Sequence, residues 1–444
     1  MAEDQETGHI APRYTAIVTE TPKFDLTSYI SNYHGRTVFR RLYLIASCST
    51  VLREEAARLA IAEAKRSPDI PNYRNACALI GEPVDSTWVN QQEKKNNAEV
   101  KRLENELKQY KNNLIRESIR MGSEDLGAQY HALGELGNAI KAYSRMRDYC
   151  TAPAHIAATA FRIIAVVIEQ KQWLSVQSQV TKVRSLQTKP EEAARYQPKI
   201  MAAQGLSHMA AGEFKEAANA FVGVESTLGD TYADTITPND VAVYGGLCAL
   251  ASMSRSELQT RVLDNNNFRS FLELEPHIRR AINSFVASKY SQCLEIVDSY
   301  RADYLLDIYL QDQYYNIYQK IRTKSIVQYF QPFSRVTLDS MEAMFGASSV
   351  LPSWQQPQTT TNRTSPQPTS TPSPQQTPFV AELIHMITTK QIAARIDLEN
   401  SVLIAHQADK RAEMQKQALD TIDDFISEAQ VKLLRLNALN GGLE

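Results

Sequence analysis

Glycine is scarce in this sequence. Only 16 of the 444 residues are Gly, about half of the ~7% found in average proteins. This scarcity counts against Gly-rich nucleotide-binding folds and against all-β sandwiches, which need many tight turns. The sequence also lacks the pattern G-x-x-x-x-G-K-[ST], which forms the phosphate-binding loop of many nucleotide-binding proteins. The composition therefore favours a mainly helical protein.

Patterns that carry catalytic or metal chemistry are also missing. The eight histidines never lie within four residues of one another, so neither H-x-H nor H-E-x-x-H occurs. The five cysteines are far apart and form no C-x-x-C pair, which is typical of buried thiols in a reducing compartment. We expect a protein that is not an enzyme, with no catalytic residue, no bound metal and no cofactor.

The sequence has no apolar segment long enough to indicate a membrane span. It also has no excess of positive charge that would indicate binding to a polyanion such as nucleic acid. The longest uncharged apolar stretch, residues 241–254, is shorter than the ~20 residues that span a bilayer. The acidic N-terminus lacks the apolar core of a secretory signal. With 48 Lys and Arg against 50 Asp and Glu, the chain has no global basic field that would attract nucleic acid. We expect a soluble protein of the nucleus and cytoplasm without a membrane partner.

The N-terminal part of the chain shows helical periodicity after a polar start. Residues 1–22 are polar and predict a mobile arm, whereas residues 23–120 predict helices. Between Asn90 and Ile119, a highly charged stretch predicts one long helix with a narrow apolar seam. The seam has only about two heptads, so it favours a helix that lies along a neighbouring helix pair. Its residues are Val100, Leu103, Leu107, Tyr110 and Leu114.

Residues 121–315 contain a degenerate repeat with a tetratricopeptide-like layout. In each copy, large or small apolar residues stand two, five and nine positions after a turn residue. The copies are 37, 41 and 76 residues apart, the last step being close to two periods of ~34 residues. They predict helix pairs that stack into a solenoid suited to holding other proteins, with the helical part of the next domain starting at about residue 240. The copies are Gly134, Leu136, Ala139, Tyr143; Lys171, Trp173, Val176, Val180; Gly212, Phe214, Ala217, Phe221; and Ser288, Tyr290, Cys293, Val297.

Residues 316–405 predict three helices followed by a hairpin, which is the order of a winged helix. Between the second and third helices, 26 of the 32 residues from 347 to 378 are Ser, Thr, Pro or Gln, so we expect a disordered insertion. The third helix carries Glu382 and no Lys or Arg before Lys390, which argues against reading a DNA groove. The expected helices are 317–330, 336–345 and 379–389, and the expected strands are 393–396 and 402–405.

Two surfaces of the C-terminal part are candidates for binding partner proteins. The edge of the hairpin would offer unpaired backbone groups for strand addition. Residues 406–440 predict a final long helix with one apolar stripe, which needs a partner in its own domain or in another chain. The candidate residues are Arg395, Asp397, Val402 and Ile404 at the hairpin and Ala418, Ile422, Phe425, Ala429, Leu433 and Leu436 on the helix.

Helical repeats that run into a winged helix resemble the PCI-domain family, which the proteasome lid, the COP-nine signalosome and translation initiation factor three share. Several segments, which together span about residues 24–405, are similar to the subunit 1 family of the signalosome. Examples are Asn-Tyr-His-Gly-Arg at 32–36 and Tyr-Gly-Gly-Leu-Cys-Ala-Leu-Ala at 244–251. The others are Phe24–Leu26 with Tyr29, Arg41–Leu42, Leu107–Asn112, Ile115–Arg120, Asp125–Gly127, Ala142–Arg145, Arg147–Thr151, Val241–Val243, Phe271–Pro276, Leu305–Leu310 and Ile326–Phe330.

The resemblance implies a non-catalytic scaffold in a complex that removes a ubiquitin-like modifier from cullins and so regulates cullin-RING ubiquitin ligases. It implies other PCI and metalloprotease-fold subunits as partners, with the catalytic chemistry in a different subunit. It also implies winged helices that meet edge to edge and C-terminal helices that gather in a bundle. The insertion at 347–378 departs from the family, where a short turn is expected. The alternatives are the paralogous proteasome-lid subunit and a nucleic-acid-binding PCI protein.

Overall fold

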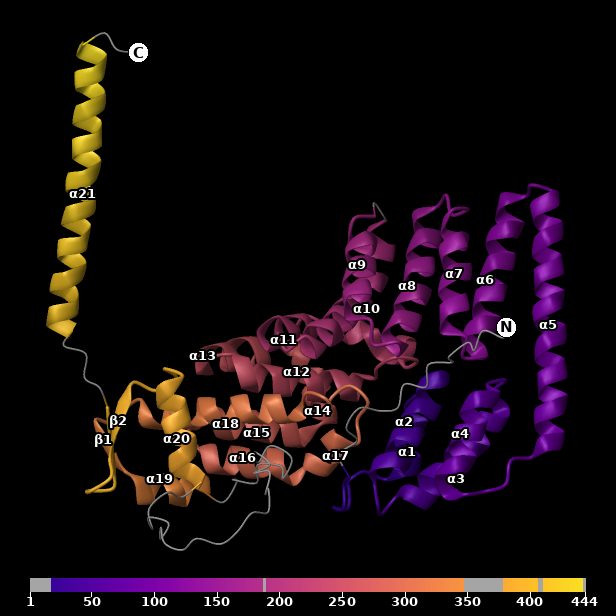
Figure 1. The fold of residues 1–444 in the computed structure, drawn as a ribbon, viewed down its shortest axis with the longest axis horizontal. Coiled ribbons are helices and arrows are strands. Elements are labelled where there is room, and N and C mark those ends of the chain that lie inside the picture. The colour runs from indigo at the N-terminus through magenta and orange to yellow at the C-terminus, as the bar shows by residue number, and fades with distance from the viewer. Residues whose placement is uncertain (1–16, 187–188, 347–377, 406–409, 442–444) are drawn as a thin grey trace, which may run out of the picture. The chain divides into compact units, whose positions relative to one another are not determined.

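The computed structural model describes residues 17–186, 189–346, 378–405 and 410–441. The chain divides into two compact units, Met1–Ser325 and Ile326–Glu444. The described residues are mainly helical, as the sequence predicts, with a small sheet in the second unit (Figure 1). The predicted disordered insertion lies outside the described residues except for its last residue. Among the described helices, none combines the length and the apolarity needed to cross a membrane.

The first unit is a succession of helices in which most neighbours along the chain pack against each other. In Figure 1, helices α5 to α9 lie side by side. The helices are α1 (Leu26–Ser31), α2 (Arg36–Cys48), α3 (Arg53–Arg66), α4 (Ile70–Ile80), α5 (Ser86–Asn112), α6 (Arg116–Ala132), α7 (Leu136–Arg147), α8 (Pro153–Glu169), α9 (Trp173–Arg184), α10 (Pro190–Ala210), α11 (Phe214–Val222), the 3₁₀ helix η1 (Ser226–Tyr232), α12 (Pro238–Ser252), α13 (Arg255–Glu257), the π-helix η2 (Leu258–Leu263), α14 (Asn266–Leu274), α15 (Pro276–Val286), α16 (Tyr290–Ser299) and α17 (Arg301–Leu305). Helix α18 (Tyr314–Phe330) begins in this unit and ends in the second.

Part of the predicted N-terminal arm is packed. Val18 is buried, with 4% of its surface exposed, and forms a parallel bridge with Ser49. Its backbone N–H donates to Cys48 O at 2.8 Å, and its carbonyl accepts from Thr50 N at 3.0 Å. The polar composition of the arm concealed this contact, because a single buried Val is too short a signal to predict a strand. Residues 1–16 lie outside the described residues.

The predicted long helix is shorter than expected at its C-terminal end. Helix α5 stops at Asn112, and Leu114 adopts a positive φ of 56° with 81% of its surface exposed. Leu103 and Leu107 of the predicted seam are buried in a cluster with residues of α6. The seam therefore packs on a neighbouring helix, as expected, but its last residue, Leu114, belongs to a turn.

All four predicted repeat copies begin at the same kind of turn. The turn residues Gly134, Lys171, Gly212 and Ser288 have φ values of 83°, 55°, 79° and 63°. In each case the next residue donates its backbone N–H to the carbonyl five positions earlier, at 2.8–3.0 Å, which is the Schellman arrangement that ends a helix. The following helix, α7, α9, α11 or α16, starts two residues after the turn residue. Degenerate sequence thus forms one recurring helix–turn–helix geometry.

The second unit contains a three-stranded antiparallel sheet in the order β1-β3-β2. Figure 1 shows this sheet beside α20. Val336, which the sequence places in a helix, instead lies in a strand, because a β-branched residue there pairs with Leu403 across the sheet. The elements are the end of α18, β1 (Arg335–Thr337), α19 (Leu338–Phe345), α20 (Pro378–Thr388), β2 (Ala394–Asp397), β3 (Val402–Ala405) and α21 (Lys410–Asn440).

Candidate functional site

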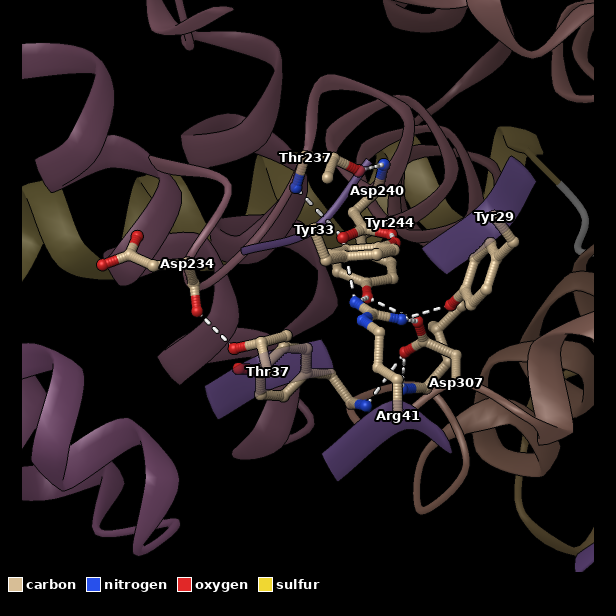
Figure 2. Close-up of polar contacts among 11 residues, drawn as sticks. Tyr29, Tyr33, Thr37, Arg41, Asp234, Thr237, Asp240, Tyr244 and Asp307 are labelled. Atoms are coloured by element: carbon tan, nitrogen blue, oxygen red, sulfur yellow. Dashed lines mark hydrogen bonds and ion pairs between the residues drawn. The ribbon is translucent and has the colours of Figure 1, made fainter. Parts of the chain in front are cut away.

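A buried network of charged residues in the first unit surrounds Arg41 of α2. The side chain of Arg41 has no exposed surface, and its guanidinium binds two carboxylates (Figure 2). Arg41 Nη2 lies 2.9 Å from Asp240 Oδ2 of α12, and Arg41 Nη1 lies 2.6 Å from Asp307 Oδ2, just after α17. Arg41 also donates to the hydroxyl of Tyr29 and, at 3.3 Å, to that of Tyr244. Residues separated by 199 and 266 positions are thereby joined.

Each carboxylate is held by local backbone geometry before it meets Arg41. Asp240 is the third residue of α12 and forms a capping box with Thr237, whose N–H donates to Asp240 Oδ2 at 3.1 Å. Asp307 accepts the backbone N–H groups of Tyr309 and Leu310, both at 2.9 Å. These local hydrogen bonds orient the carboxylates of Asp240 and Asp307 independently of Arg41, so that both are positioned to accept hydrogen bonds from its guanidinium.

Two tyrosines donate the remaining hydrogen bonds to the carboxylates. Tyr33 Oη donates to Asp240 Oδ1 at 2.7 Å, and Tyr244 Oη donates to Asp307 Oδ2 at 2.8 Å. Burial raises the pKa of both phenols, so they remain protonated and able to donate. The guanidinium carbon of Arg41 also lies 4.0 Å from the centre of the Tyr33 ring, in a cation–π contact.

Burial and pairing act in opposite directions on the charges of this network. Burial is the largest single effect on Arg41 and disfavours its charge, but the coulombic effects of Asp240, Asp307 and the neighbouring tyrosines together outweigh it and raise the pKa of Arg41. Burial also raises the pKa of Asp240, and the opposite effect of Arg41 only partly compensates. One guanidinium thus serves two carboxylates, and Arg41 Nε has no hydrogen-bond partner among the described residues. Such a network holds α1 and α2 in one position on α12 and α17.

A second network around Arg36 of α2 connects four helices of the first unit. Arg36 Nη1 lies 2.7 Å from Asp69 of the α4 cap, and Arg36 Nε lies 3.1 Å from Glu169 at the end of α8. His131 of α6 contacts the other oxygen of Glu169 at 2.6 Å. Burial opposes the charge of Glu169, but the hydrogen bond with His131 and the charges of Arg36 and Arg40 lower the pKa of Glu169 to about 2.

Gly134 leaves the space that the Arg36 network needs. A Cβ atom at position 134 would lie 2.6 Å from Asp69 Oδ2 and 3.4 Å from Arg36. Gly134 must therefore be small for two reasons: its positive φ, and the Arg36–Asp69 ion pair that lies against it.

The four predicted hairpin residues are divided between an outer and a central strand of the sheet in the second unit. Arg395 and Asp397 lie in β2, an outer strand, but Val402 and Ile404 lie in β3, the central strand, which pairs on both sides. The prediction that all four lie at an edge is corrected, because the sequence did not reveal β1. The backbone groups of β3 are already used by its neighbours.

The side chains of the same four residues share one face of the sheet. Ile404 pairs with Arg395 on one side and with Arg335 of β1 on the other, and Arg395 is exposed. Asp397 accepts the backbone N–H groups of Glu399 and Asn400 at 3.1 and 3.3 Å, so its carboxylate shapes the hairpin turn. Arg395 is consequently the charged residue of this set whose side chain is exposed.

The predicted stripe on α21 is exposed along the helix. Ile422 and Phe425 are 52% and 71% exposed, and Ala429 is half-buried. Further large apolar residues, Leu419 and Ile426, also face solvent and widen the stripe. The exposed stripe residues of the original set are Ala418, Ile422, Phe425, Leu433 and Leu436.

The sequence did not predict the Arg41 network, although five of its members lie within the segments that carry the family resemblance. Arg and Asp at large separations look like ordinary surface charges when no structure is known. Among the described residues, no group of three or more His, Cys, Asp or Glu side chains is arranged to hold a metal ion. The five members are Tyr29, Tyr33, Arg41, Tyr244 and Asp307.

Comparison with known proteins agrees with this architecture. A family model described as 26S proteasome subunit RPN7 matches residues 85–261, and one described as the PCI domain matches residues 297–407. A COP9 signalosome complex subunit 1 from Emericella nidulans is 52% identical, with 96% of this chain and 84% of that protein covered. Its counterpart from Arabidopsis thaliana is 37% identical, with 94% and 90% covered. A 26S proteasome non-ATPase regulatory subunit 6 from Caenorhabditis elegans is 22% identical, with 82% and 83% covered.

Proposed function

The chain belongs to the COP9 signalosome subunit 1 family, and from this premise we propose that it is a non-catalytic scaffold subunit of a signalosome. Its direct partners would then be the other subunits of that complex. The observation that carries the proposal is the 52% identity to a signalosome subunit over nearly the whole chain.

The geometry supports a role in assembly. The first unit is made of helix pairs fixed by buried charges, which provides a rigid arm. The second unit offers an outer strand with the exposed Arg395, and α21 offers an apolar stripe. An exposed apolar helix face costs free energy in water, so it favours association with other helices. These surfaces are suited to holding proteins together.

The finer part of the proposal concerns what the assembled complex does. The chain would support removal of the ubiquitin-like modifier from cullins, and thereby regulate cullin-RING ligases, while a different subunit supplies the metalloprotease chemistry. We also place this activity in the nucleus and the cytoplasm.

A reconstitution experiment tests this function. The purified chain alone should not release the modifier from a cullin, and a complex assembled with it should do so faster than one assembled without it. Affinity purification of the tagged chain followed by mass spectrometry should recover signalosome subunits. Isopeptidase activity of the isolated chain that survives removal of contaminating subunits would contradict the non-catalytic role.

The second candidate is a subunit of the proteasome lid. It is favoured by the match of residues 85–261 to the RPN7 model and by the proteasome relative. That relative is 22% identical, against 52% for the signalosome relative, so we rank this candidate lower. The same purification separates the two, because recovery of proteasome particles in place of signalosome subunits would favour the lid.

A further inference from the structure

A cavity of about 220 Å³ opens beside the Arg41 network in the first unit. Its floor includes the buried side chains of Asp240, Asp307 and Tyr304. Its mouth includes Tyr300 and the exposed Lys23, which precedes α1. The family assignment and the proposed assembly role make no use of this space.

The cavity is lined by more carboxylates than cations. Asp240 and Asp307 on the floor share the single guanidinium of Arg41. At the mouth, Asp303 accepts the backbone N–H of Lys23 at 2.8 Å. A fourth carboxylate, Glu275, accepts from the Asn239 amide at 2.7 Å and lies 3.3 Å from His277 Nδ1. Four carboxylates thus line the cavity beside one lysine, Lys23, and Arg41 pairs with two of them without lining it, so a further positive group would be favoured there.

Aromatic rings supply the second feature of the cavity. Six rings line it, those of Phe24 and of five tyrosines. His277 stacks on Tyr300 with a centroid distance of 3.9 Å. The ammonium group of Lys23 lies 4.0 Å from the centre of the Tyr300 ring. The side chain of Lys23 therefore already places one alkylammonium group at the mouth of the cavity.

The size of the cavity limits the class of ligand. Sites for cofactors and drug-sized molecules usually measure about 300–1,000 Å³, so this cavity is too small for a nucleotide. Carboxylates beside aromatic faces are the surroundings that favour organic cations. A side-chain-sized amine satisfies both conditions.

We propose that this cavity is a binding site for an alkylammonium group, with Tyr300 as its aromatic contact and Asp303 as a nearby carboxylate, and that Lys23 occupies the mouth in the free chain. Lys23 is thus an internal occupant that an external amine displaces. The proposal does not depend on the assembly function, because it concerns binding to the isolated chain.

The test measures binding of two amines to the full chain at constant ionic strength. The probes are n-butylammonium, a free amine, and Nα-acetyl-lysine methylamide, a lysine side chain carried on a peptide backbone. Neutral n-butanol serves as the uncharged control. Saturation-transfer NMR detects binding, and calorimetry gives the affinity. Removing the internal occupant with Lys23→Ala should tighten n-butylammonium binding roughly fivefold, since an exposed cation–π contact has about that effect.

Matched variants separate this site from general attraction to an acidic surface. Lys141→Ala removes one exposed lysine of α7 and should leave the affinity unchanged. Tyr300→Leu and Asp303→Asn should each weaken binding several-fold in the Lys23→Ala background. If circular dichroism shows that Tyr300→Leu does not fold, the affinity of the Asp303→Asn variant for n-butylammonium alone tests the proposal.

The outcomes are distinguishable. Binding of both amines supports a site that accepts a lysine of another polypeptide, and binding of n-butylammonium alone supports a site for free amines. The proposal is overturned if the Lys23→Ala chain binds neither amine, or if n-butanol binds equally well. It is also overturned if binding survives Asp303→Asn unchanged.

Discussion

At the scale of single residues, Arg41 differs from most charged residues because two buried carboxylates depend on it. Asp240 and Asp307 each keep other hydrogen-bond donors, but no other basic side chain pairs with them in the described part of the chain. A buried ion pair contributes little net stability when it forms, because desolvation offsets the attraction. Removing one partner alone is costly, since the remaining charge stays buried. Removing Arg41 should therefore cost more stability than removing either carboxylate.

Arg41→Met should therefore lower the free energy of unfolding by about 3–5 kcal/mol, because it leaves two buried carboxylates without a cation. Asp240→Asn should cost less, about 1–3 kcal/mol, because Arg41 keeps Asp307. Urea unfolding of the isolated chain measures both. Arg58→Met, which removes one member of an exposed pair on α3, is the control and should change stability by less than ~0.5 kcal/mol. Equal losses for Arg41→Met and Asp240→Asn would contradict this expectation.

Glu169 gives a prediction about pH. Its pKa is about 2 in the folded chain against 4.5 for the free group, so its ionised form stabilises the fold above about pH 4.5. This stabilisation disappears as the pH falls from 4.5 toward 2. At pH 7, Glu169→Gln should lower the free energy of unfolding by roughly 3 kcal/mol, since the pKa differs by about 2.5 units between the folded and unfolded chain. The difference from wild type in urea unfolding should shrink between pH 5 and pH 3, and a difference independent of pH would refute the assignment.

At the scale of elements, the repeat turns explain which parts of the fold could be predicted. The spacing of apolar residues marks each turn, so the sequence locates Lys171 and Ser288 as turn residues without any glycine. The turn at Leu114, which also has a positive φ, went unrecognised, because an apolar residue at that position continues the seam of α5. Strand β1 went unrecognised because three residues are too few to show alternation. Periodicity therefore predicts long helices well and short elements poorly.

The positive φ of Ser288 is a small strain that glycine would relieve. Ser288→Gly should raise the free energy of unfolding by about 0.5–1 kcal/mol, because Gly adopts this conformation without a Cβ clash. Gly212→Ala should lower it by a similar amount, and no neighbouring atom lies within 4 Å of the added Cβ to complicate the result. Thermal unfolding followed by circular dichroism measures both. Ser288→Ala is the matched control and should be nearly neutral; a gain equal to that of glycine would rule out backbone strain as the cause.

Helix α21 tests the assembly role of an element directly. Ile422→Asp with Phe425→Asp should leave the melting temperature close to wild type, because both side chains are exposed. The double variant should nevertheless lose co-purification with signalosome subunits, because burying unpaired charges in an apolar bundle costs several kcal/mol. Gln417→Asp with Ser427→Asp adds the same charge on exposed residues outside the stripe and should still co-purify. If the stripe variant assembles normally, α21 is not a main assembly surface; if it unfolds, the stripe belongs to the chain's own core.

At the scale of the whole molecule, the first unit joins its beginning to its end. Lys23 binds Asp303, Glu20 lies 3.0 Å from Arg301, and Arg41 binds Asp307. A stack of helical repeats normally depends only on contacts between neighbours, so its ends can be removed at modest cost. These contacts between the first and last helices of the unit should make its unfolding more cooperative than that of a simple stack of repeats. The contacts could not be predicted from sequence, because periodicity reports local neighbours only.

Deleting residues 17–48 should therefore destabilise the helices that remain. We expect the melting temperature to fall by roughly 5 °C or more, because Asp240 and Asp307 lose their cation and the apolar surface beneath α2 becomes exposed. Deleting residues 410–441 should leave the melting temperature unchanged, since the large apolar side chains of α21 are exposed. Circular dichroism during heating compares the two truncated chains. Equal stability of both would mean that these long-range contacts contribute nothing.

The separation of Arg41 from Asp307 also sets a delay during synthesis on the ribosome. Asp307 follows Arg41 by 266 residues, which at about 5–20 residues per second takes roughly 13 to 53 s. Throughout that interval the nascent helices α1 and α2 have no second carboxylate to bind, although α2 already has α3 to pack against. The N-terminal helices are thus the first to be made, but their ion pair with Asp307 is among the last contacts to form. This interval is the one in which a chaperone would matter most.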